Sequence, residues 1–148
     1  MNIKKILKIV KSAKVARLAT AAPNLQPYLT PVVFVLEKTN IFIPLDQKPK
    51  SVSFKELKRV KNIQRNPKVA FLADNYEDDW ERLWFIMLIG QARLVEQGRS
   101  RKGNEDIRKV HDLFLDKYHQ YSKVDIGQIY IKINVLRGYY WRYNKANV

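Results

Sequence analysis

The chain has 148 residues, of which 46% are hydrophobic, and this predicts a single domain over residues 1–148 with its own core. It has no cysteine and two histidines, which excludes disulfides, thiolate catalysis and Cys-ligated metals, so we expect no metal site. The net charge of +14 favours anionic partners: nucleic acid, an acidic membrane surface, or a ligand with phosphates or carboxylates.

The first segment, MNIKKILKIVKSAKVA, predicts an amphipathic helix. Ile3, Ile6, Leu7 and Val10 recur at helical spacing. Lysines interrupt the apolar run, and no small-residue cleavage site follows, so the segment does not match a signal peptide. The chain also has no run of 18 or more apolar residues, the length needed to cross a bilayer. We therefore expect a cytoplasmic protein without a membrane association.

Three strands and a second helix are predicted next. Residues 15–23 form a strand that enters a turn at Pro23-Asn24, and residues 28–37 form a strand that is apolar almost throughout and is expected to be buried on both faces. A tight turn at 38–40 precedes a strand at 41–45. A basic loop then leads into a helix that starts near Val52 and ends at Asn66-Pro67. The apolar residues of this helix are Phe54, Leu57, Val60 and Ile63.

The second half predicts two long strands around a third helix. Residues 68–74 form a strand, 75–82 an acidic connection, and 83–97 a long strand with a bulge or bend at Gly90. After a loop at 98–104, a helix at 105–121 turns Ile107, Val110, Phe114 and Tyr118 inward, and a final strand at 128–143 bends near Gly138. About six strands and three helices without βαβ alternation favour a mainly β fold, a closed or split antiparallel barrel with flanking helices.

The basic loop is the strongest candidate for a binding site. Residues 46–67 carry seven Lys or Arg against Asp46 and Glu56. Pro49 stiffens the backbone between two lysines, and Ser51 is placed to cap the following helix, whose free N–H groups favour an anion. No glycine-rich phosphate motif is present, so side chains and this turn would bind a phosphate. A solvated cationic surface is the alternative explanation.

The run from VARLATAAP to KVAFLAD resembles the pyridoxamine 5′-phosphate oxidase-like flavin-binding split barrels in the order of its strands, turns, basic loop and short helix. Within that superfamily, LDQKPKS, LKRVKNIQRNP, NYEDDWERLWF and GQARLV are most similar to a branch of F420-dependent enzymes. The resemblance covers about residues 13–97. It implies a split β-barrel homodimer that binds two cofactors in grooves at the subunit interface.

The same resemblance implies which residues contact the cofactor. A strand and its neighbour face the ring, a basic turn and the helix after it hold the phosphate, and a C-terminal Trp/Arg region closes the groove from the partner chain. The strand positions are Thr30, Pro31, Val32 and Val33, and the neighbouring strand has Pro44 and Leu45. The basic turn has Lys48, Lys50 and Ser51, and the helix after it has Arg59 and Asn62. The C-terminal region has Trp141 and Arg142.

The sequence also departs from the oxidase itself. The oxidase's C-terminal extension with residues for the substrate phosphate is not evident, so oxidation of a vitamin B6 phosphate is not expected. Lys48 and Lys50 replace the Ser-Arg-Lys type of turn, which leaves FMN and coenzyme F420 both open, with F420 preferred because its carboxylate tail suits a cationic protein.

Other features have alternative explanations. Six aromatic residues would stack on a ring or, more commonly, fill the core and a dimer interface: Trp80, Trp84, Tyr139, Tyr140, Trp141 and Tyr143. The acidic cluster Glu77-Asp78-Asp79 is expected to be a solvated loop, and both histidines to be surface or packing residues.

No nucleophile–base pair is visible, so no catalytic residue is named, and a bound cofactor would supply the chemistry. The leading hypothesis is an F420-dependent oxidoreductase that transfers hydride to or from a small organic substrate. An FMN-dependent oxidoreductase, a non-catalytic cofactor carrier and a basic nucleic-acid-binding barrel are the alternatives.

Overall fold

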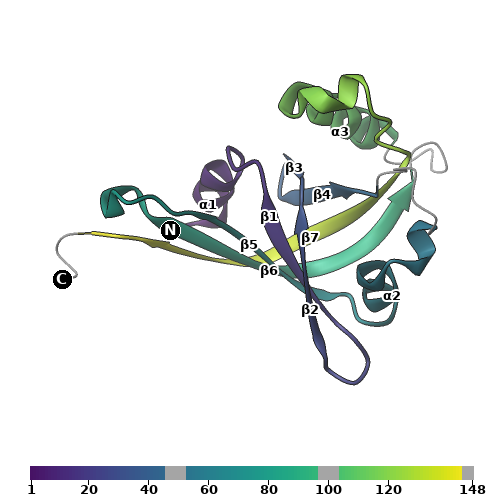
Figure 1. Cartoon of the computed structure of the whole chain (residues 1–148), viewed down its shortest axis with the longest axis horizontal. Helices are drawn as coiled ribbons and strands as arrows, with labels where there is room; N and C mark the ends of the chain where they lie inside the picture. Colours follow the sequence, from purple (N-terminus) through teal and green to yellow (C-terminus); the bar gives the residue numbers. More distant parts are fainter. Residues whose placement is uncertain (46–52, 97–103, 145–148) are drawn as a thin grey trace.

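The computed structural model of the chain describes residues 1–45, 53–96 and 104–144 (Figure 1). Its α-helices are α1 (Ile3–Val10), α2 (Lys58–Arg65) and α3 (Asn104–Lys117), and its short 3₁₀ helices are η1 (Phe54–Glu56), η2 (Trp80–Arg82) and η3 (His119–Ser122). The strands are β1 (Ala16–Ala21), β2 (Pro27–Val32), β3 (Val35–Glu37), β4 (Asn40–Pro44), β5 (Lys68–Asn75), β6 (Trp84–Glu96) and β7 (Ile129–Arg142).

The strands form one antiparallel sheet of seven strands in the order β2-β1-β5-β6-β7-β4-β3. The two edge strands, β2 and β3, are consecutive in the chain and are joined by Val33 and Phe34 alone. Two edges connected by so short a link must lie close together, so the sheet curls into a barrel. In the described part of the chain, β2 and β3 share no backbone ladder, and the barrel is split between them.

The prediction of one strand over 28–37, buried on both faces, was wrong. The segment breaks after Val32, and β2 is mostly exposed, whereas β3 is buried. Pro27 and Pro31 lack a backbone N–H, and a strand with two prolines is tolerated at a sheet edge but not between two neighbours. After β2 the chain crosses to the opposite edge, where β3 pairs with β4.

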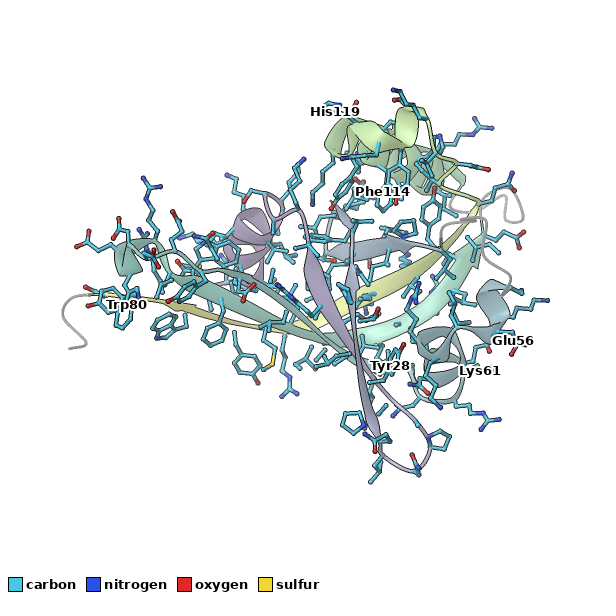
Figure 2. The ribbon with its side chains drawn as sticks, in the orientation of Figure 1. Tyr28, Glu56, Lys61, Trp80, Phe114 and His119 are labelled. Atoms are coloured by element: carbon cyan, nitrogen blue, oxygen red, sulfur yellow. The ribbon has the colours of Figure 1, made fainter. Side chains whose placement is uncertain are left out.

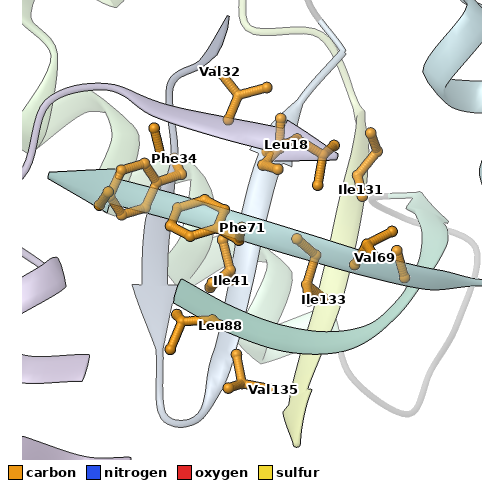
Figure 3. Packing of buried hydrophobic residues seen from close by; sticks show 14 of the residues in the cluster. Leu18, Val32, Phe34, Ile41, Val69, Phe71, Leu88, Ile131, Ile133 and Val135 are labelled. Atoms are coloured by element: carbon orange, nitrogen blue, oxygen red, sulfur yellow. The ribbon is translucent and has the colours of Figure 1, made fainter. Parts of the chain in front are cut away.

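The main core fills the barrel and is covered on one side by α1. Leu18, Ile41 and the edge-to-face pair Phe34–Phe71, with ring centroids 4.9 Å apart, lie at its centre (Figure 3). Ile6, Leu7 and Val10 of α1 are buried, as the spacing predicted. A second, smaller cluster lies beneath α3 and contains the four residues predicted to face inward: Ile107, Val110, Phe114 and Tyr118.

Two glycines mark places where β6 and β7 approach their neighbours closely. The register of the β6–β7 pair shifts between Ile89 and Gly90, which confirms the predicted bulge. A Cβ on Gly90 would collide with the backbone carbonyl of Asn134 in β7. Gly138 lies under α1, where a Cβ would come within 2.9 Å of Ile3 Cδ1.

The second helix begins later than predicted. A single helix from Val52 was expected, but the described chain has η1 at Phe54–Glu56 and then an extended residue, Leu57, before α2 starts at Lys58. Leu57 caps α2 without a side-chain hydrogen bond. The proposed cap, Ser51, lies outside the described residues.

One face of the sheet is covered by none of the helices in the described part of the chain. Directly paired residues on neighbouring strands point to the same side, and a row of such pairs runs across β2, β1, β5, β6 and β7. In that order its members are Pro31, Arg17, Leu72, Met87 and Tyr139. The next row includes Phe85 and Trp141, whose rings stack at a centroid distance of 5.7 Å although both side chains are exposed. We call this surface the outer sheet face.

None of the helices in the described ranges is both long enough and apolar enough to span a membrane.

Candidate cofactor-binding pocket

A pocket of about 570 Å³ opens between β2 and β4. This volume lies in the range typical of small-molecule sites. Strands β2 and β4 supply five of the lining residues, α2 supplies one arginine, the segment that follows α3 supplies four, and Val15 and Val33 lie next to strands. The lining residues are Val15, Thr30, Pro31, Val32, Val33, Ile43, Pro44, Arg59, Tyr118, Gln120, Tyr121 and Val124.

The wall combines a largely apolar surface with a few polar side chains. Valines and prolines form most of the apolar part, and several of them come from β2, the crossover after it and β4. Thr30, Gln120 and the half-buried Arg59 are the polar and cationic groups within reach of a ligand. This composition suits a flat apolar ring system attached to an anionic group, because apolar walls bind the ring and a guanidinium binds an anion well.

Lys117 and Tyr118 fix the position of the segment after α3 that lines the pocket. The Phe34 amide donates to Tyr118 Oη over 3.1 Å, and that hydroxyl donates to the Lys14 carbonyl over 2.7 Å. Lys117 Nζ donates to the Phe34 carbonyl over 2.9 Å and lies 3.7 Å from the centroid of the Phe34 ring. Because Phe34 directly follows the lining residue Val33, these bonds hold the end of α3 against the strand crossover.

This side of the pocket contains groups with shifted pKa values. Burial, and then repulsion from Lys14 and Lys11, lowers the pKa of Lys117 from 10.5 to about 8. Burial raises the pKa of the Tyr118 hydroxyl, and the hydrogen bond with the Phe34 backbone acts in the opposite direction. Both shifts follow from packing α3 onto the barrel.

The pocket brings together six of the residues that the family resemblance implied. They come from β2, the crossover, β4 and α2: Thr30, Pro31, Val32, Val33, Pro44 and Arg59. Lys48, Lys50 and Ser51 lie outside the described residues, so their assignment to a phosphate-binding turn stays a prediction.

Two other implied residues do not line the pocket. Leu45 is 2% exposed, and its amide donates to the Ile129 carbonyl, so it belongs to the core. Asn62 is 1% exposed, and its Nδ2 donates to Thr20 Oγ1 over 3.0 Å. The amide of Asn62 joins α2 to β1, because a buried amide needs a partner within the protein. The contact of Asn62 with a cofactor that the resemblance implied stays a prediction.

Trp141 and Arg142 lie at the far end of β7. Trp141 stacks on Phe85, and Arg142 pairs with Trp84, on the long β6–β7 arm that extends away from α2 and α3. Figure 2 shows Trp80 at the tip of this arm. Within one chain, these residues do not reach the pocket.

Sequence reasoning missed half of the lining. Tyr118 had been predicted only as a packing residue, which it also is, since a tyrosine at an inward helix position is typical of a core. Gln120 and Tyr121 lie in η3 and Val124 follows it, and no periodicity in the sequence indicates that this segment faces β2.

The acidic cluster behaves as a solvated loop. Arg82 lies 3.5 Å from Glu77 and 3.9 Å from Asp79, and all three side chains are well exposed. Among the residues that the structure describes, no group of three His, Asp or Glu side chains is arranged to hold a metal.

We compared the sequence with protein-family models and the fold with solved structures. The sequence model of the pyridoxamine 5′-phosphate oxidase family matches residues 3–142. A conserved hypothetical protein of Mycobacterium tuberculosis superposes with a TM-score of 0.73 at 20% identity, covering 100% of this chain and 89% of that one. A FAD-binding protein of Mesorhizobium loti gives 0.69 at 12% identity, covering 95% and 94% of the two chains.

A FAD-binding protein of Mycobacterium smegmatis gives a TM-score of 0.63 at 17% identity, covering 97% of this chain and 96% of that one. At these identities the structural likeness shows a shared fold, the split barrel. A search of curated protein sequences found no match.

Proposed function

Because the chain belongs to the pyridoxamine 5′-phosphate oxidase family, we propose that the pocket between β2 and β4 binds a flavin and that the protein is a flavin-dependent oxidoreductase. One observation carries the proposal: six residues that the family resemblance assigned to the cofactor line a single pocket of about 570 Å³. Two structures with the same fold are named FAD-binding proteins, which supports a flavin-type cofactor.

The residues present fit such a group. Val32, Val33 and Pro44 would pack against the ring, and Arg59 would hold an anionic group, together with the predicted turn at Lys48 and Lys50. When bound, the flavin supplies the hydride chemistry. The protein would bind the ring, orient it and exclude water, which is why the pocket needs no nucleophile–base pair of its own.

FMN is the first candidate, since the family match supports a flavin in general. Coenzyme F420 is the second candidate, because the net charge of +14 and the similarity of four sequence segments to the F420-dependent branch favour a ligand with several carboxylates. FMN carries a phosphate monoester, whereas F420 carries a tail with several carboxylates. Salt screens the attraction between charges that are more than about 8 Å apart at physiological ionic strength. The attraction of the protein for the F420 tail should therefore weaken as salt is added.

We further propose that the protein is a homodimer whose subunits pack through the outer sheet face. Two observations support this. The row of paired residues begins at Pro31, which lines the pocket, and it continues to the exposed aromatic residues of the β6–β7 arm. A second copy on this face would therefore cover Phe85 and Trp141 and bring its own arm near the pocket, where the family resemblance places Trp141 and Arg142.

The test is a parallel titration of the apoprotein with FMN, FAD and F420 at low and physiological salt, followed by a hydride-transfer assay. FMN should bind with one site per chain, and Lys48→Ala/Lys50→Ala should weaken it about tenfold or more, because each charge-assisted hydrogen bond contributes about 1.5–3 kcal/mol. Lys4→Gln/Lys8→Gln is the matched control, because it removes two positive charges on α1 away from the pocket.

The outcomes separate the alternatives. Tight binding of F420 but not of FMN or FAD would change the cofactor and leave the pocket assignment intact. A bound cofactor that never exchanges hydride would indicate a carrier. Binding of oligonucleotides, with no affinity for any of the three cofactors, would refute the proposal.

A further inference from the structure

We propose that a second cavity, separate from the flavin pocket, binds a small ligand with two or more phosphate groups and an aliphatic body. This cavity has a volume of about 750 Å³ and lies between α1, the β3–β4 turn and α3. Figure 1 shows α1 and α3 on the two sides of β3. We call it the lysine cavity. Its lining is Asn2, Lys4, Lys5, Leu7, Lys8, Lys11, Leu36, Glu37, Lys38, Thr39, Lys109 and Leu113.

Its charge is far from balanced. Six lysines line the cavity against one carboxylate, Glu37. That carboxylate is 7% exposed and already accepts a hydrogen bond from Lys109 Nζ over 3.1 Å. Within the described ranges, none of the four lysines from α1 and its C-cap pairs with a carboxylate: Lys4, Lys5, Lys8 and Lys11. An anionic ligand would compensate this excess.

The arrangement on α1 is unfavourable for the helix by itself. Lys4, Lys8 and Lys11 are spaced four and three residues apart and share one face, where like charges repel. Lys4 and Lys5 also lie in the first turn, where the helix dipole favours anions, and α1 contains no acidic residue. A bound anion would relieve both effects, so the cluster has a physical reason to bind one.

The floor of the cavity is aliphatic. Leu7 and Leu36 are buried, Leu113 is half-buried, and all three line the cavity between the lysines. Neither arginine nor an aromatic ring contributes to the described lining. Ammonium groups bind phosphate as point charges without the fixed geometry of a guanidinium, so lysines around a leucine floor suit a phosphorylated aliphatic molecule.

The absence of aromatic residues from this lining also distinguishes it from a single-stranded nucleic-acid site, where bases stack on exposed rings interleaved with cationic side chains. The concave shape and the volume are those of a small-molecule site.

The lysine cavity lies beside the middle of α3, and the flavin pocket lies beyond the C-terminal end of that helix. Lys109 and Leu113 line the first, whereas Tyr118 and the residues after it line the second. Between them, the contacts of Lys117 and Tyr118 with Phe34 close α3 onto the strand crossover. Because the two sites are lined by different residues, each can be removed without removing the other.

The test is calorimetric titration of the full chain with pyrophosphate, inorganic tripolyphosphate and octyl diphosphate at two salt concentrations. We expect one site per chain, affinity that rises from pyrophosphate to tripolyphosphate, and tighter binding of octyl diphosphate than of pyrophosphate because of the leucine floor. Lys4→Gln/Lys8→Gln should weaken all three by about tenfold or more, whereas Lys48→Ala/Lys50→Ala should leave them unchanged.

Glutamine preserves helix propensity. A melting temperature no lower than that of the wild type, with an unchanged FMN affinity, would show that the fold and the flavin pocket of Lys4→Gln/Lys8→Gln are intact. The proposal is overturned if none of the three ligands binds, or if both double variants weaken binding equally, which would indicate attraction to net charge alone. It is also overturned if a single-stranded oligonucleotide displaces tripolyphosphate and spans several chains, because the surface would then serve nucleic acid.

Discussion

Lys117 offers the sharpest test of the packing around α3. Its ammonium donates to the Phe34 carbonyl and lies over the Phe34 ring, and burial followed by repulsion from Lys14 and Lys11 lowers its pKa to about 8. We expect that replacing it with methionine removes a pH-dependent cost of folding. The methionine keeps a long apolar side chain in the same place.

The magnitude follows from the two pKa values. A fall from 10.5 to about 8 corresponds to about 3 kcal/mol of disfavoured protonation in the folded state. Because the ammonium is only partly buried, solvent screens it, and we expect a measurable effect of about 1–2 kcal/mol. Below pH 8 the group is charged in both states, so the full cost is present.

Between about pH 8 and 10.5 the folded state releases this proton before the unfolded state does, so the contribution of Lys117 to stability rises with pH. Urea unfolding at pH 7, 8, 9 and 10 measures this. The free energy of unfolding of the wild type should gain about 1–2 kcal/mol relative to Lys117→Met over this range. Lys123→Met, which alters an exposed lysine, should run parallel to the wild type. A constant difference between the wild type and Lys117→Met would refute the reasoning.

Three further predictions concern the fold and the proposed dimer. Gly90→Ala should lower the free energy of unfolding by about 1–3 kcal/mol, and by more than Gly138→Ala does. The new methyl group meets a backbone carbonyl at position 90 but flexible side-chain ends at position 138. Chemical denaturation of both variants measures which one loses more stability. Asn62→Ala should cost about 1–3 kcal/mol because Thr20 loses its buried partner, and Gln64→Ala, at an exposed position of α2, is the denaturation control. Trp141→Asp should give a folded monomer in sedimentation, and an unchanged dimer would place the interface elsewhere.

The sequence predicted those features that depend on residues close together in the chain. The buried faces of α1 and α3 follow from residues three and four positions apart, and Gly90 marked the bulge because only glycine fits against Asn134. The break between β2 and β3 was missed because an apolar run does not show where the chain crosses from one sheet edge to the other. The start of α2 was missed because Leu57 continues the apolar spacing although its backbone is extended.

The two pockets also differ in how far their lining could be predicted from the sequence. The strand wall of the pocket between β2 and β4 was predictable because the family resemblance is carried by residues 13–97, which include both strands. The side formed by Tyr118 and the lysine cavity were not, since each joins segments from opposite ends of the chain. Lys4 and Lys109 lie over a hundred positions apart, and only the fold places them around one cavity.

The sheet order has a consequence for synthesis on the ribosome. The β3–β4 hairpin pairs on its inner side with β7, through a ladder that joins Asn40 to Asn134, roughly ninety residues later. Likewise, α1 rests on Gly138. The nascent chain therefore carries the apolar faces of α1 and the hairpin without their partners until β7 emerges from the exit tunnel. Pairing between such distant segments folds slowly, and chaperones that bind exposed apolar segments have their longest opportunity in this interval.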